Sequence, residues 1–158
     1  MGSTNYKGVA GSNWAWGTWT NNGPTNNNNG LDAGDGIFYR TDGNRRLDIV
    51  GITDGTSNTL MVGEDIPGNN QHCSWAFFNH ATGTASIPLN TAVTPTQLAA
   101  QGGAGNWPNV YSFRSMHSGG ANFTLGDASV RFLRDSIALA NYRAAATIRG
   151  GETLSLDN

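Results

Sequence analysis

One histidine and one aspartate lie ten positions apart in the segment 113–133, FRSMHSGGANFTLGDASVRFL. If the chain between them folds back, the carboxylate of Asp127 could orient the imidazole of His117 as a general base. The alternative is structural: Asp127 would then hold His117, or the backbone of the turn, by hydrogen bonds. We expect the structural role, because a catalytic role needs further groups in matching geometry.

The residues between and after this pair predict a β-hairpin. Residues 122–125 alternate between polar and apolar side chains, as in a strand with one buried face. Residues 126–128 have the chemistry of a tight turn, and Val130 and Phe132 are expected to resume the apolar alternation. The histidine would lie at the entry of the hairpin and the aspartate at its tip.

A second polar cluster lies in residues 52–64, ITDGTSNTLMVGE. Short polar side chains in such a turn usually bond neighbouring backbone amides, and we expect this role for Asp54, Asn58 and Glu64. The alternative is a calcium site at Asp54, Asn58 and Asp65, although the spacing lacks the carboxylate pattern of an EF-hand loop. We therefore expect no cofactor and retain calcium as the alternative.

Other side chains could support a hydrolase or a metal-dependent enzyme. Zinc or copper could use His72, His80 and His117, but their spacing matches no recognised ligand pattern. Ser115 or Ser118 could be a nucleophile, but neither lies in the strand–turn–helix context of a G-x-S-x-G motif. An enzymatic function is therefore the least favoured interpretation.

The single cysteine excludes an internal disulfide and a cysteine-based zinc site. Residues 71–78 predict a strand, in which Cys73 shares a face with Trp75 and Phe77. In that position Cys73 is expected to be a small buried side chain rather than a reactive thiolate.

Three of the five tryptophans lie within six residues, at positions 14, 16 and 19. With the Asn-rich run at 21–29, which predicts an exposed loop, Trp14, Trp16 and Trp19 could form a platform on which sugar rings stack. We expect instead that these side chains cover the sheet, since aromatic residues dominate protein cores, and retain the platform as the alternative.

Composition limits the function classes further. With 158 residues the chain is long enough for one domain; we expect residues 1–3 to be a remnant of cloning and residues 4–158 to form that domain. A net charge of −2 argues against nucleic acid or an anionic membrane as partner, and Lys7 is the only lysine. No apolar run is long enough to span a membrane.

The chain as a whole predicts a mainly β domain of the α+β class, an antiparallel sheet or β-sandwich-like head domain with one C-terminal helix at about 137–148 packed on the sheet. Asp135 and Ser136 are expected to cap this helix. Short helical turns are predicted at 48–52, with Asp48 as cap, and at 96–101. The further predicted strands are 6–10, 36–40, 59–62 and 153–156.

Three segments together resemble a known family: residues 52–64, 113–133 and 141–157. They are similar to the C-terminal region of the DUF1559 proteins, which are abundant in Planctomycetes and resemble type IV pilins and type II secretion pseudopilins. The hairpin matches the H-X9-DG region of that family, with His117 and Asp127 at the marked positions and Ala128 where the family has glycine. Residues 8–11, 36–40 and 87–90 also resemble the family.

The resemblance implies a secreted or cell-surface head domain with no catalytic residues to carry over. Family members begin with a prepilin leader and an apolar helix that packs into filaments or lies in the membrane. Membrane association is thus expected only through such an N-terminal helix, which is absent from this sequence. The expected function is noncatalytic assembly with other pilus-like subunits or surface binding. The alternative is a carbohydrate-binding module that uses the tryptophans.

Overall fold

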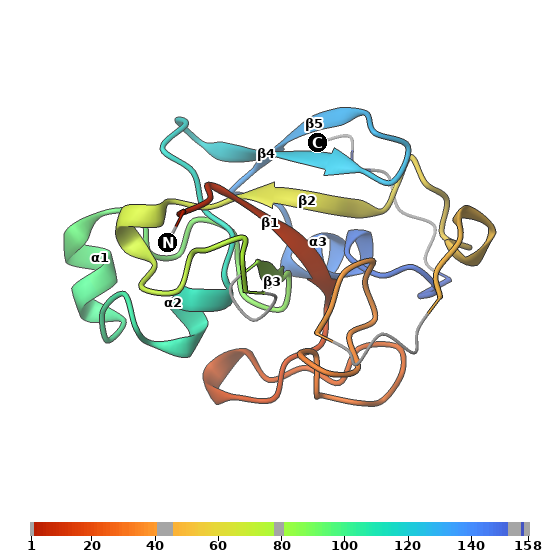
Figure 1. The fold of residues 1–158 in the computed structure, drawn as a ribbon, viewed down its shortest axis with the longest axis horizontal. Helices are drawn as coiled ribbons and strands as arrows, with labels where there is room; N and C mark the ends of the chain where they lie inside the picture. Colours follow the sequence, from red (N-terminus) through yellow and green to blue (C-terminus); the bar gives the residue numbers. More distant parts are fainter. Residues whose placement is uncertain (1, 41–45, 78–80, 152–155, 157–158) are drawn as a thin grey trace.

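The computed structural model describes residues 2–40, 46–77, 81–151 and 156. Its centre is one five-stranded sheet in the order β3-β1-β2-β4-β5 (Figure 1). All neighbouring strands run antiparallel except β1 and β3, which are parallel. The strands are β1 (Tyr6–Gly11), β2 (Leu60–Glu64), β3 (Thr82–Thr84), β4 (Gly120–Leu125) and β5 (Val130–Arg134). The predicted class, mainly β with α+β elements, is confirmed, although the sheet is mixed.

The predicted hairpin is formed by β4 and β5, but its second strand is oriented differently from the prediction. The three-residue loop sets a register in which Phe132 lies opposite Asn122, on the outer face of the sheet. Val130 and Phe132 are therefore exposed, at 64% and 47%, and Leu133 fills the core instead. The prediction for these two side chains was wrong because the loop length, rather than apolar character, decides which face each residue takes.

The C-terminal helix α3 (Leu139–Ala145) packs on the sheet, where the rings of Tyr142 and Phe123 lie 5.9 Å apart. It is shorter than the predicted 137–148, and no side chain caps its N-terminus. At its C-terminal side the backbone bonds other segments: Ile148 N donates to Asp35 O at 3.0 Å, and Ile148 O accepts from Thr53 N at 2.8 Å. These long-range bonds replace the next helical turn.

Two other predicted strands do not form among the described residues. The segment 36–40 makes two backbone hydrogen bonds to β1: Gly36 N donates to Ala10 O, and Phe38 N donates to Val9 O. It does not become a strand, because β1 already pairs with β3 and β2 on its two edges. Residues 71–77 make one isolated bridge, between Ser74 and Ser3; Cys73 and Ser74 are buried, and Trp75 and Phe77 are exposed. The predicted strand at 153–156 lies outside the described residues except for Leu156.

The short helices follow local sequence signals. The helical turn predicted at 96–101 is observed as α1 (Pro95–Ala100), at whose start Thr94 and Gln97 form a capping box. Asp48 caps the 3-10 helix η2 (Ile49–Gly51) by accepting from Gly51 N, which confirms that prediction. The remaining helices are α2 (Trp107–Tyr111), η1 (Gly17–Trp19) and η3 (Pro67–Asn69).

The buried apolar side chains form two clusters. The larger one joins the sheet to α3, and Gly63 lets Phe123 lie directly against β2, since a Cβ at that position would be 2.3 Å from its ring. The smaller one lies between the loop after β1 and helix α2, and consists of Trp14, Leu31, Ile87, Val110 and Tyr111, with Trp19 packed against it.

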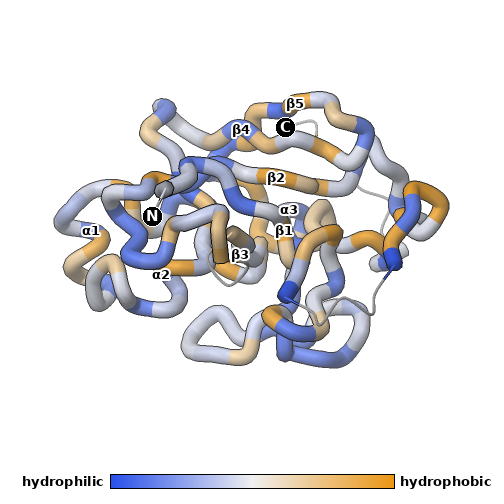
Figure 2. Tube along the Cα trace, viewed as in Figure 1, coloured by the Kyte–Doolittle hydropathy of each residue, from blue (hydrophilic) through white to orange (hydrophobic). Residues whose placement is uncertain are grey.

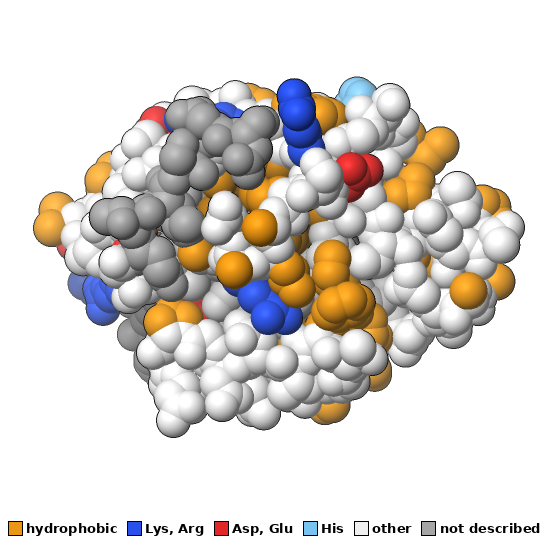
Figure 3. Space-filling model, turned by 180° about the vertical axis from the view of Figure 1, so that it is seen from behind, with side chains coloured by type: hydrophobic (Ala, Val, Ile, Leu, Met, Phe, Trp, Pro, Cys, Tyr) orange, Lys and Arg blue, Asp and Glu red, His pale blue; other side chains and the backbone are white. Residues whose placement is uncertain are grey.

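The surface is polar but carries little charge. Figure 2 shows the loop after η1, which contains the Asn-rich run, as hydrophilic. Seen from behind, few Lys, Arg, Asp or Glu side chains lie among the hydrophobic and uncharged polar ones (Figure 3). Within the described ranges, no helix has the length and apolar character needed to span a membrane.

Candidate functional site

His117 lies beside Glu64, at the start of the hairpin. Its Nε2 is 3.3 Å from Glu64 Oε1, and its backbone N donates to Ser115 Oγ at 3.2 Å. Glu64 Oε2 accepts from the backbone N of Asn122 at 2.7 Å. Burial alone would raise the pKa of Glu64, but the hydrogen bonds from Asn122 and Ser115 and the nearby His117 together lower it. Glu64 is therefore a charged carboxylate, and its contacts connect β2 to β4 and to the loop that precedes β4.

Asp127 lies at the other end of β4 from His117. A strand of six residues spans roughly 20 Å. Asp127 Oδ1 accepts from Ser129 N and Oγ, at 2.9 and 2.6 Å, and its backbone N donates to Thr56 O. The idea that Asp127 orients His117 is therefore wrong, and what Asp127 holds is the backbone of the turn.

Asp54 and Asn58 bond the backbone around them. Asp54 Oδ2 accepts from Gly150 N at 2.7 Å, and its Oδ1 accepts from Gly151 N at 2.9 Å. Asn58 Nδ2 donates to Asp54 O at 3.4 Å. These contacts fix the loop before β2 to the chain that follows α3, which is the structural role expected from the sequence.

Asp65, the third residue of the calcium alternative, lies at the opposite end of β2 and is already bound by two cations. Its Oδ2 is 3.0 Å from Lys7 Nζ, its Oδ1 is 2.8 Å from Arg114 Nε, and all three side chains are buried. Nowhere in the described part of the chain do three His, Cys, Asp or Glu side chains group as a metal site requires. The calcium alternative at Asp54, Asn58 and Asp65 is therefore contradicted. Of the three histidines considered for zinc or copper, His80 lies outside the described residues.

Cys73 is buried beside the same cluster. Its Sγ donates to Thr4 O at 2.7 Å, and burial, together with the nearby charge of Asp65, raises the pKa of the thiol to about 12. Trp75 and Phe77 are exposed, so the predicted shared face with Cys73 is wrong. The thiol is nevertheless buried and protonated.

The three clustered tryptophans have different environments. Trp14 is only 1% exposed and packs edge-on against Trp16, with ring centroids 4.9 Å apart. Trp14 therefore belongs to the core, as the favoured interpretation of these aromatic side chains expected, and the alternative platform role is wrong for this residue. Trp16 is 47% exposed, whereas Trp19 is half-buried against the smaller core cluster.

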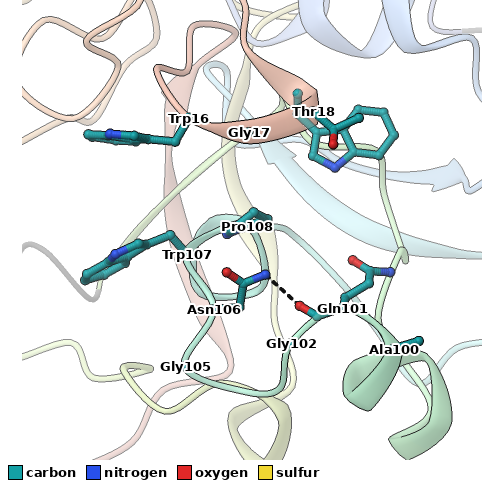
Figure 4. A pocket seen from close by; sticks show the side chains of 11 residues that line it. Trp16, Gly17, Thr18, Ala100, Gln101, Gly102, Gly105, Asn106, Trp107 and Pro108 are labelled. Carbon is teal, nitrogen blue, oxygen red and sulfur yellow. Dashed lines mark hydrogen bonds between the residues drawn. The ribbon is translucent and has the colours of Figure 1, made fainter.

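Trp16 instead faces a tryptophan from a distant part of the chain. Trp16 in the loop before η1 and Trp107 at the start of α2 form the sides of a cleft of about 860 Å³ (Figure 4). Both rings project to the same side, one above the other, and Gln101 and Asn106 lie along the same cavity. The other lining residues are Gly17, Thr18, Trp19, Ala100, Gly102, Gly105 and Pro108.

A second cavity of about 390 Å³ adjoins the cleft, because Trp16 and Trp107 line both. Its other lining residues are Leu31, Arg40 and Tyr111. Arg40 Nε and Nη2 bond the two carboxylate oxygens of Asp32, at 2.5 and 2.8 Å. The two exposed aromatic walls, the amide side chains and the cation paired with Asp32 make this cleft a candidate binding site.

The model of the family described as "Protein of unknown function (DUF1559)" matches residues 2–140. The chain belongs to the DUF1559 family. No curated protein and no solved structure shows significant similarity to it.

In this DUF1559 domain the hairpin loop keeps a glycine-like conformation without glycine. Ala128 has φ +68°, and Ala128 N donates to Leu125 O at 2.9 Å. This is a three-residue hairpin loop with its last residue in the left-handed region, the position that glycine favours. Alanine at this position therefore keeps the turn intact at some cost in strain.

Sequence reasoning missed Trp107 as a site residue of the DUF1559 domain. It follows the glycine-rich stretch 102–105, and the nearest aromatic residue in the sequence is Tyr111. The only local signal is the helix start, where Asn106 and Pro108 flank it. Its pairing with Trp16 depends on the fold, because 91 positions separate the two residues.

Proposed function

We propose that this DUF1559 domain is a noncatalytic head domain, secreted or held at the cell surface, which binds carbohydrate through the cleft between Trp16 and Trp107. The observation that carries the proposal is the pair of half-exposed indole rings, 47% and 52% accessible, on two sides of one cleft. Exposed tryptophans at such positions are available to stack on a ligand ring, whereas the buried Trp14 is not.

The polar groups of the cleft suit a ligand rich in hydroxyl groups. Within the described part of the chain, the amide oxygens of Gln101 and Asn106 accept no hydrogen bond, and the hydroxyl of Thr18 makes none. Amide and hydroxyl groups can pair with sugar hydroxyls, which both donate and accept. Binding sites commonly combine aromatic walls with a few such polar groups.

The environments of the acidic residues support a noncatalytic role. Glu64, Asp54 and Asp127 each accept hydrogen bonds from backbone N–H groups, and Asp65 is buried between two cations. None of these carboxylates lines the cleft. A hydrolase acting on a sugar in the cleft would need carboxylates at the reacting bond.

The test is retention of the domain on insoluble cellulose, chitin and xylan. We expect one of these polymers to retain the domain, without release of reducing sugar. Trp16→Ala and Trp107→Ala should lose retention, and Trp75→Ala, at an exposed tryptophan outside the cleft, should keep it. Equal retention of all variants would show that the cleft is not the site, and release of sugar would contradict the noncatalytic role.

A second candidate function is assembly with pilus-like subunits, which the family resemblance suggests. The supporting observation is a group of exposed apolar side chains around the hairpin: Met116, Val130 and Phe132. Sedimentation of the domain at increasing concentration tests it. Association that Phe132→Ser abolishes would support assembly, and a monomer at every concentration would count against self-assembly through this face.

A further inference from the structure

We infer that the ligand is a neutral polysaccharide bound along its length, with Trp16 and Trp107 shared by two neighbouring sugar sites. The inference rests on the proposed carbohydrate binding and specifies the class of polymer. Its basis is the presence of two adjoining cavities with common walls, and the charge state of the groups that line them.

Apart from the two shared tryptophans, the cavities have different lining residues. One is lined by Gln101 and Asn106, and the other by Leu31 and Tyr111. Their volumes, about 860 and 390 Å³, fall in the range of about 300–1,000 Å³ that is usual for small-ligand sites. Each therefore has room for at least one sugar ring. Since both are open to solvent, a chain can enter one and leave through the other.

The two walls are connected by a continuous series of aromatic rings. Trp16 packs on Trp14 at 4.9 Å, Trp14 on Tyr111 at 5.3 Å, and Tyr111 on Trp107 at 5.9 Å between ring centroids. The ring of His72 stacks on that of Trp107, with the centroids 5.7 Å apart and the ring planes at 15°. Trp14 and Tyr111 are buried, at 1% and 2% exposure.

This arrangement sets the spacing of the walls before any ligand binds. Because the two inner rings are fixed in the core, the outer indoles lose little freedom on binding, and preorganised sites gain affinity in this way. The fixed spacing also explains how a domain with few charged residues can present a specific site.

The charges favour a neutral polymer. Among the residues that the structure describes, the only charged side chain that lines either cavity is Arg40, and Asp32 bonds it through two oxygens. A uronic acid carboxylate would have to displace Asp32 or lie beside it, so the like charge opposes an acidic polymer. The described lining residues of both cavities include no carboxylate that could attract a cationic polymer. Hydroxyl groups of a neutral sugar meet neither obstacle.

The first experiment measures binding of mono- to hexasaccharides derived from the neutral polymer that retains the domain, by titration calorimetry. We expect weak binding of the monosaccharide and a rise of about tenfold or more when a second ring is added, because a second aromatic contact forms. Trp16→Ala and Trp107→Ala should each weaken the longer oligosaccharides about tenfold, and Trp16→Phe and Trp107→Phe should retain most of the affinity. A monosaccharide that binds as tightly as a trisaccharide would overturn the two-site inference but leave carbohydrate binding intact.

The second experiment tests the charge argument with Asp32→Asn, which removes the negative charge of Asp32 beside Arg40. Wild-type protein should not bind polygalacturonate, whereas Asp32→Asn should bind it with an affinity that falls as salt is added. Both proteins should bind the neutral oligosaccharide equally. Preference of the wild type for polygalacturonate would overturn the inference and keep the proposed function. Binding of a proline-rich peptide in the cleft, with no binding of any sugar, would overturn both.

Discussion

Lys7, the only lysine of the chain, lies 3.0 Å from Asp65, and neither side chain reaches solvent. Lys7 Nζ also donates to the carbonyls of Val110 and Ser112, at 2.8 and 2.7 Å. Desolvation by burial lowers the pKa of Lys7, and the neighbouring Asp65 opposes that shift. Through these contacts β1 and the residue after β2 hold the C-terminal end of α2, the helix that carries Trp107.

The first prediction concerns this buried cluster. Asp65→Asn removes the anion between Lys7 and Arg114, so we expect a loss of about 3–5 kcal/mol in the free energy of unfolding. Urea denaturation measures the change. Asp32→Asn breaks a partly exposed ion pair and serves as the control, with an expected loss of less than about 1 kcal/mol. Equal effects of the two substitutions would show that burial does not set the importance of Asp65.

The second prediction concerns the hairpin loop. Ala128 has φ +68°, a conformation that costs an L-residue about 1–2 kcal/mol relative to glycine, so Ala128→Gly should raise the free energy of unfolding by about 1 kcal/mol. Ala138→Gly, at an exposed alanine with φ −57°, should give no gain. Thermal and urea unfolding of both variants measure this difference, and a gain at Ala138 alone would contradict the explanation.

The third prediction concerns pH. The pKa of Glu64 is lower in the folded protein than in the unfolded chain, so its stabilising effect is complete above the unfolded pKa of about 4.3 and is lost as the pH falls through the folded value. Glu64→Gln should therefore cost about 1–2 kcal/mol at pH 7 and progressively less below pH 4 or so. Urea denaturation across this range measures the effect. Asp135→Asn, at an exposed carboxylate, is the control; a constant penalty for Glu64→Gln at all pH values would refute the linkage.

The fourth prediction concerns Cys73. Because burial raises the pKa of its thiol to about 12, the folded protein should react with a thiol reagent at pH 8 far more slowly than the protein in urea. The rate of colour release from a disulfide reagent measures this. A thiol introduced by Ser118→Cys, at an exposed position, should react at once in the same folded protein. Rapid reaction of both thiols would mean that Cys73 is accessible.

Local chemistry accounts for the parts of the fold that the sequence predicted well. The alternation at 122–125, the Asp48 cap and the helical turn after Pro95 each depend on residues a few positions apart, and all three are observed. The helix at 137–148 was overestimated because backbone bonds between Ile148 and distant loops compete with its last turn. Such competition leaves no trace in the local pattern.

The candidate site was predicted only in part. Trp16 was named as a possible sugar-binding residue, and the Asn-rich run was expected to be exposed. Trp14 was named with it only as a candidate of the alternative platform, and its burial in the core agrees with the structural role that was favoured. Trp107 was missed because nothing near it in the sequence indicates a partner.

The sequence by itself determined the DUF1559 resemblance, the hairpin and the scarcity of charge, since motifs, strand alternation and composition are properties of neighbouring residues or of the chain as a whole. Only the tertiary structure decided that His117 pairs with Glu64 and not with Asp127, that Lys7 and Arg114 enclose Asp65, and that Trp16 faces Trp107. Each of these contacts joins residues that lie 49 to 91 positions apart. Their proximity depends on packing of the whole chain, which no local pattern encodes.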